Sequence, residues 1–374
     1  MAGLYIHIPF CKKACHYCNF HFSTNQKHKY EFLQALCKEL QQRATELKNT
    51  TVSSVYFGGG TPSLLTSEDL NLIFKTIETY YKIAPSAEIT LEANPDDLKN
   101  SKIKMLSETQ INRLSIGVQS FFEEDLQLMN RAHNANEAVE SLKIARQYFD
   151  NISIDLMYGM PQMSVERWRE NLKVALGLGI KHMSCYALTV EPKTALEHFI
   201  KTSKHPPMND ALAASHFQVL IEDTQKAGLT HYEVCSFGTP EYFSQHNTSY
   251  WLGKPYLGVG PSAHSFDGKK RSWNVSNNTT YIKTLAKNQL PLTEEILTPE
   301  NRFNEYLMTG LRTMWGVSLR NIDKNYGSEF KTQLLENAQK HLNSKMLILE
   351  NDVLKTTNKG KFLCDGIASD LFIL

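Results

Sequence analysis

Strand-like and helix-like segments alternate along the first half of the chain, and this alternation limits the possible folds more than any other feature. Apolar runs that predict strands lie at 4–8, 55–57, 89–91, 114–118, 152–156 and 183–188. Apolar residues at helical spacing follow them over about 30–47, from Thr66 or Ser67, and over about 101–109, 136–148 and 165–177. Such alternation gives a parallel sheet, and a repeat of about thirty residues is typical of a TIM-barrel unit. We therefore predict an α/β fold with a partial (β/α)6 barrel.

The alternation fades beyond Gly238. The segment 238–298 is rich in aromatic residues, Asn, Gly and Ser, and we expect it to be irregular. A helix is predicted over about 299–314, followed by helical patterns near 319–325 and 328–342 and by two strand-like runs, MLIL and VLKT. We therefore expect a barrel domain at 1–237, an irregular segment at 238–298 and a smaller α+β, winged-helix-like domain at 299–374.

Charge and hydropathy exclude some functions. Lys and Arg total 40 against 39 for Asp and Glu, so bulk electrostatics give no support for nucleic-acid binding. No apolar stretch approaches the ~20 residues that span a bilayer, and the N-terminus lacks the features of a signal peptide. We expect a cytoplasmic protein, where thiols stay reduced.

Three cysteines in the loop after the first predicted strand indicate a metal site. Cys11, Cys15 and Cys18 follow the pattern C-x-x-x-C-x-x-C. Thiolates hold iron–sulfur clusters or zinc, and His16 or His21 could complete a Cys3His zinc site. We favour a four-iron cluster with one open iron, because structural zinc usually stabilises a small domain, whereas this loop opens a large predicted α/β barrel. The other cysteines, at 37, 185, 235 and 364, are expected to be small buried side chains.

A glycine-rich loop, GGGTP at 58–62, follows the second predicted strand. Consecutive glycines let the backbone approach a ligand closely, although a tight strand-to-helix turn would look the same. The carboxyl ends of parallel barrel strands meet at one mouth, so this loop and the cysteine loop are expected to face each other.

Together these motifs resemble the radical S-adenosylmethionine (SAM) superfamily. The resemblance is carried by Cys11, Cys15, Cys18, Tyr17 and GGGTP. It implies a [4Fe-4S] cluster whose open iron binds the amino and carboxylate groups of SAM. It also implies that GGGTP contacts the SAM amino group and that Tyr17 lies near the adenine.

Further stretches are similar to the anaerobic coproporphyrinogen III oxidase family. They are YIHIPFC (5–11), LEANP (91–95), IGVQSF (116–121), IDLMYGMP (154–161), YALTVEP (186–192) and GVGPSAHS (258–265). The resemblance covers almost the whole chain. It implies a SAM region lined by Tyr5, Gly59, Gly60, Thr61, Glu92, Gln119, Arg131, Asp155 and Ala187.

Two departures from the oxidase pattern favour the haem-chaperone branch of that family. The oxidase has a further cysteine where this chain has Phe20, and it has an extension before its first strand. The branch also carries H-N-x-x-Y-W, which here reads HNTSYW and implies haem binding by His246, Asn247, Tyr250 and Trp251. A neutral imidazole is a common axial ligand of haem iron, and the alternative for this stretch is a capped aromatic turn that packs the barrel mouth.

The expected function is therefore a haem chaperone with a [4Fe-4S] cluster, SAM and haem. Its partners would be acceptor haem proteins, including respiratory, membrane-associated ones, and a second copy in a homodimer. The alternative is oxygen-independent coproporphyrinogen III oxidase, a radical decarboxylase, so enzymatic activity stays open at this point. A radical enzyme with another substrate and a zinc-stabilised interaction protein rank below these.

Overall fold

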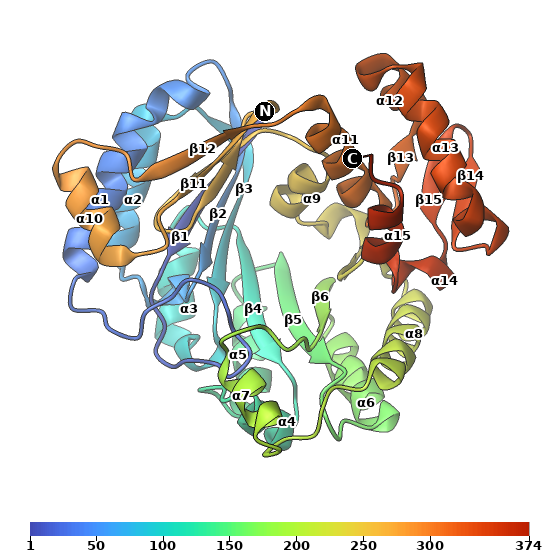
Figure 1. Ribbon diagram of the computed structural model, residues 1–374. Coiled ribbons are helices and arrows are strands. Elements are labelled where there is room, and N and C mark those ends of the chain that lie inside the picture. Colours follow the sequence, from blue (N-terminus) through green and yellow to red (C-terminus); the bar gives the residue numbers. More distant parts are fainter. Residues whose placement is uncertain (374) are drawn as a thin grey trace.

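The computed structural model describes residues 1–373, so Leu374, the last residue of the predicted C-terminal domain, lies outside it. Six parallel strands form its centre, and each of the predicted strands is present (Figure 1). Their bounds are β1 Ala2–Ile8, β2 Val52–Gly59, β3 Ile83–Ala93, β4 Arg113–Gln119, β5 Ile152–Tyr158 and β6 His182–Ala187. They pair in chain order, which confirms the partial parallel barrel.

Helices cover the outer face of these strands (Figure 1). Those on the outer face are α1 Lys29–Gln42, α2 Ser67–Tyr80, α3 Asn100–Ser107, α5 Ala135–Ala145, α6 Val165–Gly177 and α8 Asp210–Lys226, whereas α4 Glu123–Leu128 and α7 Ala195–Lys201 lie beside the cysteine loop. Short 3-10 turns lie at Ala44–Leu47, Pro62–Leu64, Pro95–Asp97 and Pro240–Tyr242. The predicted helices are confirmed to within a few residues, while α4, α7 and α8 were not predicted.

The strands carry apolar side chains outward and polar ones inward. Leu4, Ile6 and Ile8 of β1 are buried in the main hydrophobic core, while the alternate residues Tyr5 and His7 are hydrogen-bonded to each other. Successive side chains of a strand point to opposite faces, so the outer face packs on the helices and the inner face is a polar chamber. This chamber is where a ligand can be held.

The expectation of an irregular segment at 238–298 is wrong. This part contains α9 Gln245–Trp251, β9 Tyr256–Val259, β10 His264–Phe266, β11 Lys270–Asn274, α10 Asn278–Ala286 and β12 Leu292–Ile296. β9 pairs in parallel with β1, and β10 to β12 continue the sheet in antiparallel fashion. β7 Thr230–Glu233 and β8 Ser236–Gly238 extend the other edge beside β6, so that 12 strands of the described chain share one sheet.

A buried ionic network attaches this segment to the barrel. Glu39 of α1 is fully buried and accepts hydrogen bonds from Arg43 (3.0 Å), Asn274 (2.7 Å), Tyr281 (2.6 Å) and the backbone N–H of Gly260 (2.9 Å). A buried carboxylate needs such partners, because an unpaired buried charge is strongly unfavourable. The network therefore holds the segment that runs from β9 to α10 against α1, next to the start of the cysteine loop.

The C-terminal residues form a second hydrophobic cluster, which begins with Phe303. Its elements are α11 Pro299–Leu311, β13 Val317–Ser318, α12 Leu319–Tyr326, α13 Ser328–Asn343, β14 Leu347–Glu350, β15 Val353–Thr356, α14 Asn358–Lys361 and α15 Cys364–Asp370. The predicted order of helices followed by a β-hairpin is confirmed. Within residues 1–373, every helix is too short or too polar to cross a membrane.

Candidate functional site

A cavity of ≈420 Å³ lies at the carboxyl ends of β2 to β6. It brings together most of the residues that the sequence assigned to the cluster and SAM. Those lining it are Cys11, Cys15, Cys18, Tyr17, Gly60, Thr61, Glu92, Gln119, Arg131, Asp155 and Ala187. Tyr5 and Gly59 lie just behind this wall: Tyr5 bonds His7, and the Gly59 N–H donates to Glu92.

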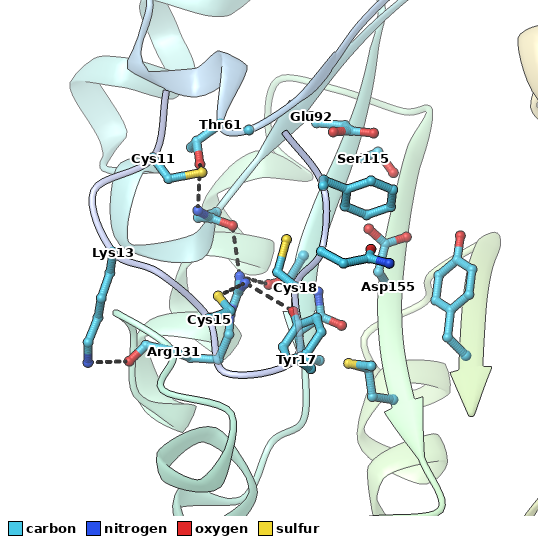
Figure 2. A pocket seen from close by; sticks show the side chains of 18 of the residues that line it. Cys11, Lys13, Cys15, Tyr17, Cys18, Thr61, Glu92, Ser115, Arg131 and Asp155 are labelled. Carbon is cyan, nitrogen blue, oxygen red and sulfur yellow. Dashed lines mark hydrogen bonds between the residues drawn. The ribbon is translucent and has the colours of Figure 1, made fainter. Parts of the chain in front are cut away.

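Two of the three cysteine sulfurs, those of Cys11 and Cys15, accept hydrogen bonds from side-chain donors (Figure 2). The Thr61 hydroxyl donates to Cys11 Sγ at 3.3 Å, and Arg131 Nη1 donates to Cys15 Sγ at the same distance. Burial raises the pKa of Cys11 to about 11 and raises that of Cys18 as well. Thiols in such surroundings become thiolates only when a cation or metal compensates the charge, and N–H and O–H groups on their sulfurs are typical of iron–sulfur sites.

The two histidines of the zinc alternative are occupied elsewhere. His16 Nδ1 bonds the carbonyl of Leu128 at 2.9 Å, and His21 Nε2 bonds Asn278 Oδ1 at 2.7 Å. Neither ring lines the cavity. Among residues 1–373 there is no group of three His, Cys, Asp or Glu side chains close enough to hold a single metal ion. The Cys3His arrangement therefore gains no support from the described chain.

The GGGTP loop packs so closely that side chains would not fit. A Cβ on Gly60 would come within 2.7–2.8 Å of the Phe10 backbone and the Ile8 carbonyl, and one on Gly59 would meet the His7 ring at 2.5 Å. Gly59 also has a φ of +107°, a conformation that glycine adopts without strain. The glycines therefore bring the loop against the strand that leads into the cysteine loop.

Carboxylates line the opposite side of the cavity. Glu92 lies in β3 and Asp155 in β5, and burial raises their pKa values to about 7 and about 6. Arg113, buried below them, favours the ionised forms of both, which lowers these pKa values in part. Ser115 lies between the two carboxylates (Figure 2). Such a group of acceptors suits ribose hydroxyls and an ammonium group, as in SAM.

Arg131 ties the two sides together. Its Nη2 donates to Asn94 Oδ1 and to the Gly117 carbonyl, both at 2.7 Å, and Nη1 lies 3.4 Å from the Tyr17 hydroxyl. Its Nε is buried and has no hydrogen-bond partner within residues 1–373. Nε is thus a donor without a protein partner in the described part of the chain, on a side chain that lines the cavity.

Several cavity residues were not singled out from the sequence. Asn94, Ser115, Met157 and Tyr186 lie within or next to the motif stretches, so those stretches were the available signal. Glu191, also in the wall, accepts a hydrogen bond from Asn19 of the cysteine loop at 2.8 Å. The exposed ring of Phe20 (70% exposed) and the half-exposed ring of Tyr186 stand at the rim.

The HNTSYW stretch lies at the other end of the barrel. His246 is 3% exposed and contacts Gly3 and Ser54, at the amino ends of β1 and β2. Tyr250 stacks on Tyr256 with ring centroids 4.0 Å apart, and the Arg312 guanidinium lies over the Trp251 ring in a cation–π contact. These residues do not line the cavity, and Figure 1 shows α9 at the opposite end from the cysteine loop.

Asn247 and His246 are held in a helix cap. The Asn247 N–H donates a hydrogen bond to the side-chain oxygen of Ser244, the N-cap residue of α9. Burial and Arg113 lower the pKa of His246 to about 3, so its imidazole is neutral. The geometry is that of the capped aromatic turn, packed at the base of the barrel and not at its mouth.

Comparison with known proteins fixes the family. Residues 5–175 match the radical SAM superfamily and residues 297–363 match the HemN C-terminal domain. A protein of Bacillus subtilis described as heme chaperone HemW is 33% identical over 370 residues, which cover 97% of each chain. One of Synechocystis with the same description is 34% identical, over 84% of this chain and 78% of its own.

The chain belongs to the HemW family of radical SAM proteins.

The fold is also that of a solved radical SAM enzyme. Coproporphyrinogen III oxidase (HemN) from Escherichia coli superposes with a TM-score of 0.87 over 99% of this chain and 90% of that one, at 24% identity. Radical SAM membership implies a [4Fe-4S] cluster and SAM. The cavity fits both: its three cysteine sulfurs lie on one loop, donors are directed at two of them, and its buried carboxylates and Arg131 line the same space.

Proposed function

We propose that this protein is a haem chaperone that uses a [4Fe-4S] cluster and SAM and delivers haem to acceptor haem proteins. The observation that carries the proposal is the nearly full-length similarity to proteins described as heme chaperone HemW. Phe20, where the oxidase pattern has a cysteine, supports the same assignment.

The cavity residues take distinct roles in this proposal. Cys11, Cys15 and Cys18 hold the cluster, and the GGGTP loop, Glu92 and Asp155 hold SAM. The cluster and SAM, when bound, supply an open iron site and a reducible sulfonium. The protein keeps donors on the sulfurs of Cys11 and Cys15 and presents acceptors to hydroxyl and ammonium groups.

Haem is the cargo, and His246 is its proposed axial ligand, with Asn247, Tyr250 and Trp251 beside it. The neutral imidazole supports this role, because only the unprotonated ring can bind iron. The acceptors are proposed to include membrane-associated respiratory haem proteins, the location to be the cytoplasm, and the assembly to be a homodimer.

Haem titration of anaerobically reconstituted protein tests the proposal. We expect a Soret band that saturates at one haem per chain and that shifts or weakens in His246→Ala. The matched control is His205→Ala, which removes a partly exposed histidine remote from the motif and should titrate like the original protein. An unchanged spectrum and affinity in His246→Ala would remove this histidine as ligand, and the absence of haem binding would refute the proposed function.

A further inference from the structure

Helix α9 closes the base of the barrel by specific contacts. The Glu88 carboxylate of β3 accepts the backbone N–H groups of Gln245 (3.0 Å) and His246 (3.1 Å). Gly3 of β1 leaves room for the imidazole, since a Cβ there would lie 3.0 Å from His246 Cε1. The Nε2 atom of His246 is buried without a partner among residues 1–373. In this docked position the atom that would bind iron cannot be reached.

The inner face of β2 holds the same imidazole. His246 Nδ1 is bonded to the Ser54 hydroxyl at 2.9 Å, and the ring stacks on Tyr56 with centroids 5.0 Å apart and planes at 29°. Ser54 and Tyr56 are two residues apart on one strand, so both point into the chamber. A stacked ring pair adds attraction beyond the area it buries. The docking of α9 thus depends on the position of the Tyr56 ring.

Tyr56 reaches the cofactor cavity at its other end. Its hydroxyl donates to Glu92 Oε1 at 2.8 Å, while Glu92 Oε2 accepts the Gly59 N–H of the GGGTP loop at 3.2 Å. Gly58 makes room for this contact, because a Cβ there would lie 3.0 Å from the Tyr56 ring and 3.2 Å from Glu92. An unbroken series of contacts therefore leads from the cavity wall through Tyr56 to His246.

We propose that Tyr56 is a positioning residue that couples the cavity to α9, so that a ligand held by Glu92 tightens the docking of the HNTSYW helix. A ligand hydroxyl on the carboxylate restricts its rotamers, and the restricted carboxylate holds the Tyr56 hydroxyl and ring in place. The coupling has a consequence for haem, which rests on the proposed function: coordination by His246 requires α9 to leave the base, so SAM and haem oppose each other. By linkage the effect is equal in both directions.

Hydrogen exchange on the reconstituted protein tests the coupling without haem. The readout is the exchange of the peptide that covers residues 245–252, with and without SAM. In the original protein we expect SAM to slow it about fivefold, which corresponds to about 1 kcal/mol, the net value of a single hydrogen bond. In Tyr56→Phe, which keeps the ring and loses the hydroxyl, we expect SAM to have no effect.

Tyr81→Phe is the matched control. It removes another buried tyrosine hydroxyl, bonded to the Leu40 carbonyl at 2.7 Å between the outer helices. Exchange in this variant should respond to SAM as in the original protein. Slowing of equal size in Tyr56→Phe, or no slowing in the original protein, would overturn the proposal.

Two further measurements keep the test decisive. If Tyr56→Phe does not fold, Ser54→Ala replaces it, because this variant removes the hydrogen bond between Ser54 and His246 and so loosens α9. The affinity for SAM should then fall about fivefold, and an unchanged affinity would contradict the coupling. In haem titrations, SAM should raise the apparent Kd for haem about fivefold in the original protein and leave it unchanged in Tyr56→Phe. A protein that binds no haem would refute the proposed function, while the exchange experiment would still decide the coupling.

Discussion

Glu92 is expected to bind SAM but to lower the free energy of unfolding of the protein. The Glu92→Gln variant measures this loss of stability. Burial raises the pKa of Glu92 from 4.5 to about 7. Because the pKa of Glu92 is higher in the folded state than in the unfolded state, ionisation of this carboxyl disfavours folding. The resulting loss of stability is absent below pH 4.5, grows as the pH rises, and is complete above about pH 7. At ~1.4 kcal/mol for each pKa unit, the full loss is about 3 kcal/mol.

Glutamine removes the charge and keeps an oxygen for the Tyr56 hydroxyl. Its amide leaves the Gly59 N–H without an acceptor, which costs about 1 kcal/mol. Cluster-free Glu92→Gln should therefore be about 2 kcal/mol more stable than the original protein at pH 8, and about 1 kcal/mol less stable at pH 4.5. The free energy of unfolding in urea at both pH values measures this, and SAM binding should weaken in the same variant.

The exposed Glu108→Gln is the control and should leave stability unchanged at both pH values. The reasoning would be refuted if Glu92→Gln were less stable than the original protein by the same amount at pH 8 and at pH 4.5. Burial would then not disfavour the ionised carboxylate of Glu92.

Three further variants test the site and its support. Gly60→Ala would bring a Cβ to 2.7 Å from the Phe10 carbonyl, so we expect severalfold weaker SAM binding, measured by calorimetry on reconstituted protein. Arg131→Met removes a charge and a donor from Cys15 and should lower the cluster reduction potential by tens of millivolts in an EPR-monitored redox titration. Glu39→Gln leaves the buried Arg43 guanidinium with only the half-exposed Glu46 as counter charge and should reduce stability by roughly 2–3 kcal/mol in urea unfolding.

The barrel could be predicted from the sequence because its strands and helices carry strong periodic signals. The outward residues of β1, Leu4, Ile6 and Ile8, form a run of alternating apolar residues that predicts a strand. By contrast, β12 is exposed along nearly its whole length and β10 has only three residues. Such strands are fixed by pairing with their neighbours, and one chain read alone does not contain that information.

The candidate site was predictable where its residues share a loop or belong to the inner face of a predicted strand. The cysteines, Thr61, Glu92 and Asp155 meet at one mouth because parallel strands point the same way. The position of His246 could not be inferred, because the chain turns back from β8 and inserts α9 at the base of the barrel. Nothing in the spacing of HNTSYW specifies which end of the barrel the helix will occupy.

The most direct test of the central claim compares haem transfer with porphyrinogen oxidation in one preparation. Reconstituted, haem-loaded protein is mixed with an apo haem protein, and the same protein is supplied with coproporphyrinogen III, SAM and a reductant. The account predicts that the acceptor gains its haem spectrum while coproporphyrinogen III stays unchanged. Conversion to protoporphyrinogen IX without haem transfer would contradict it.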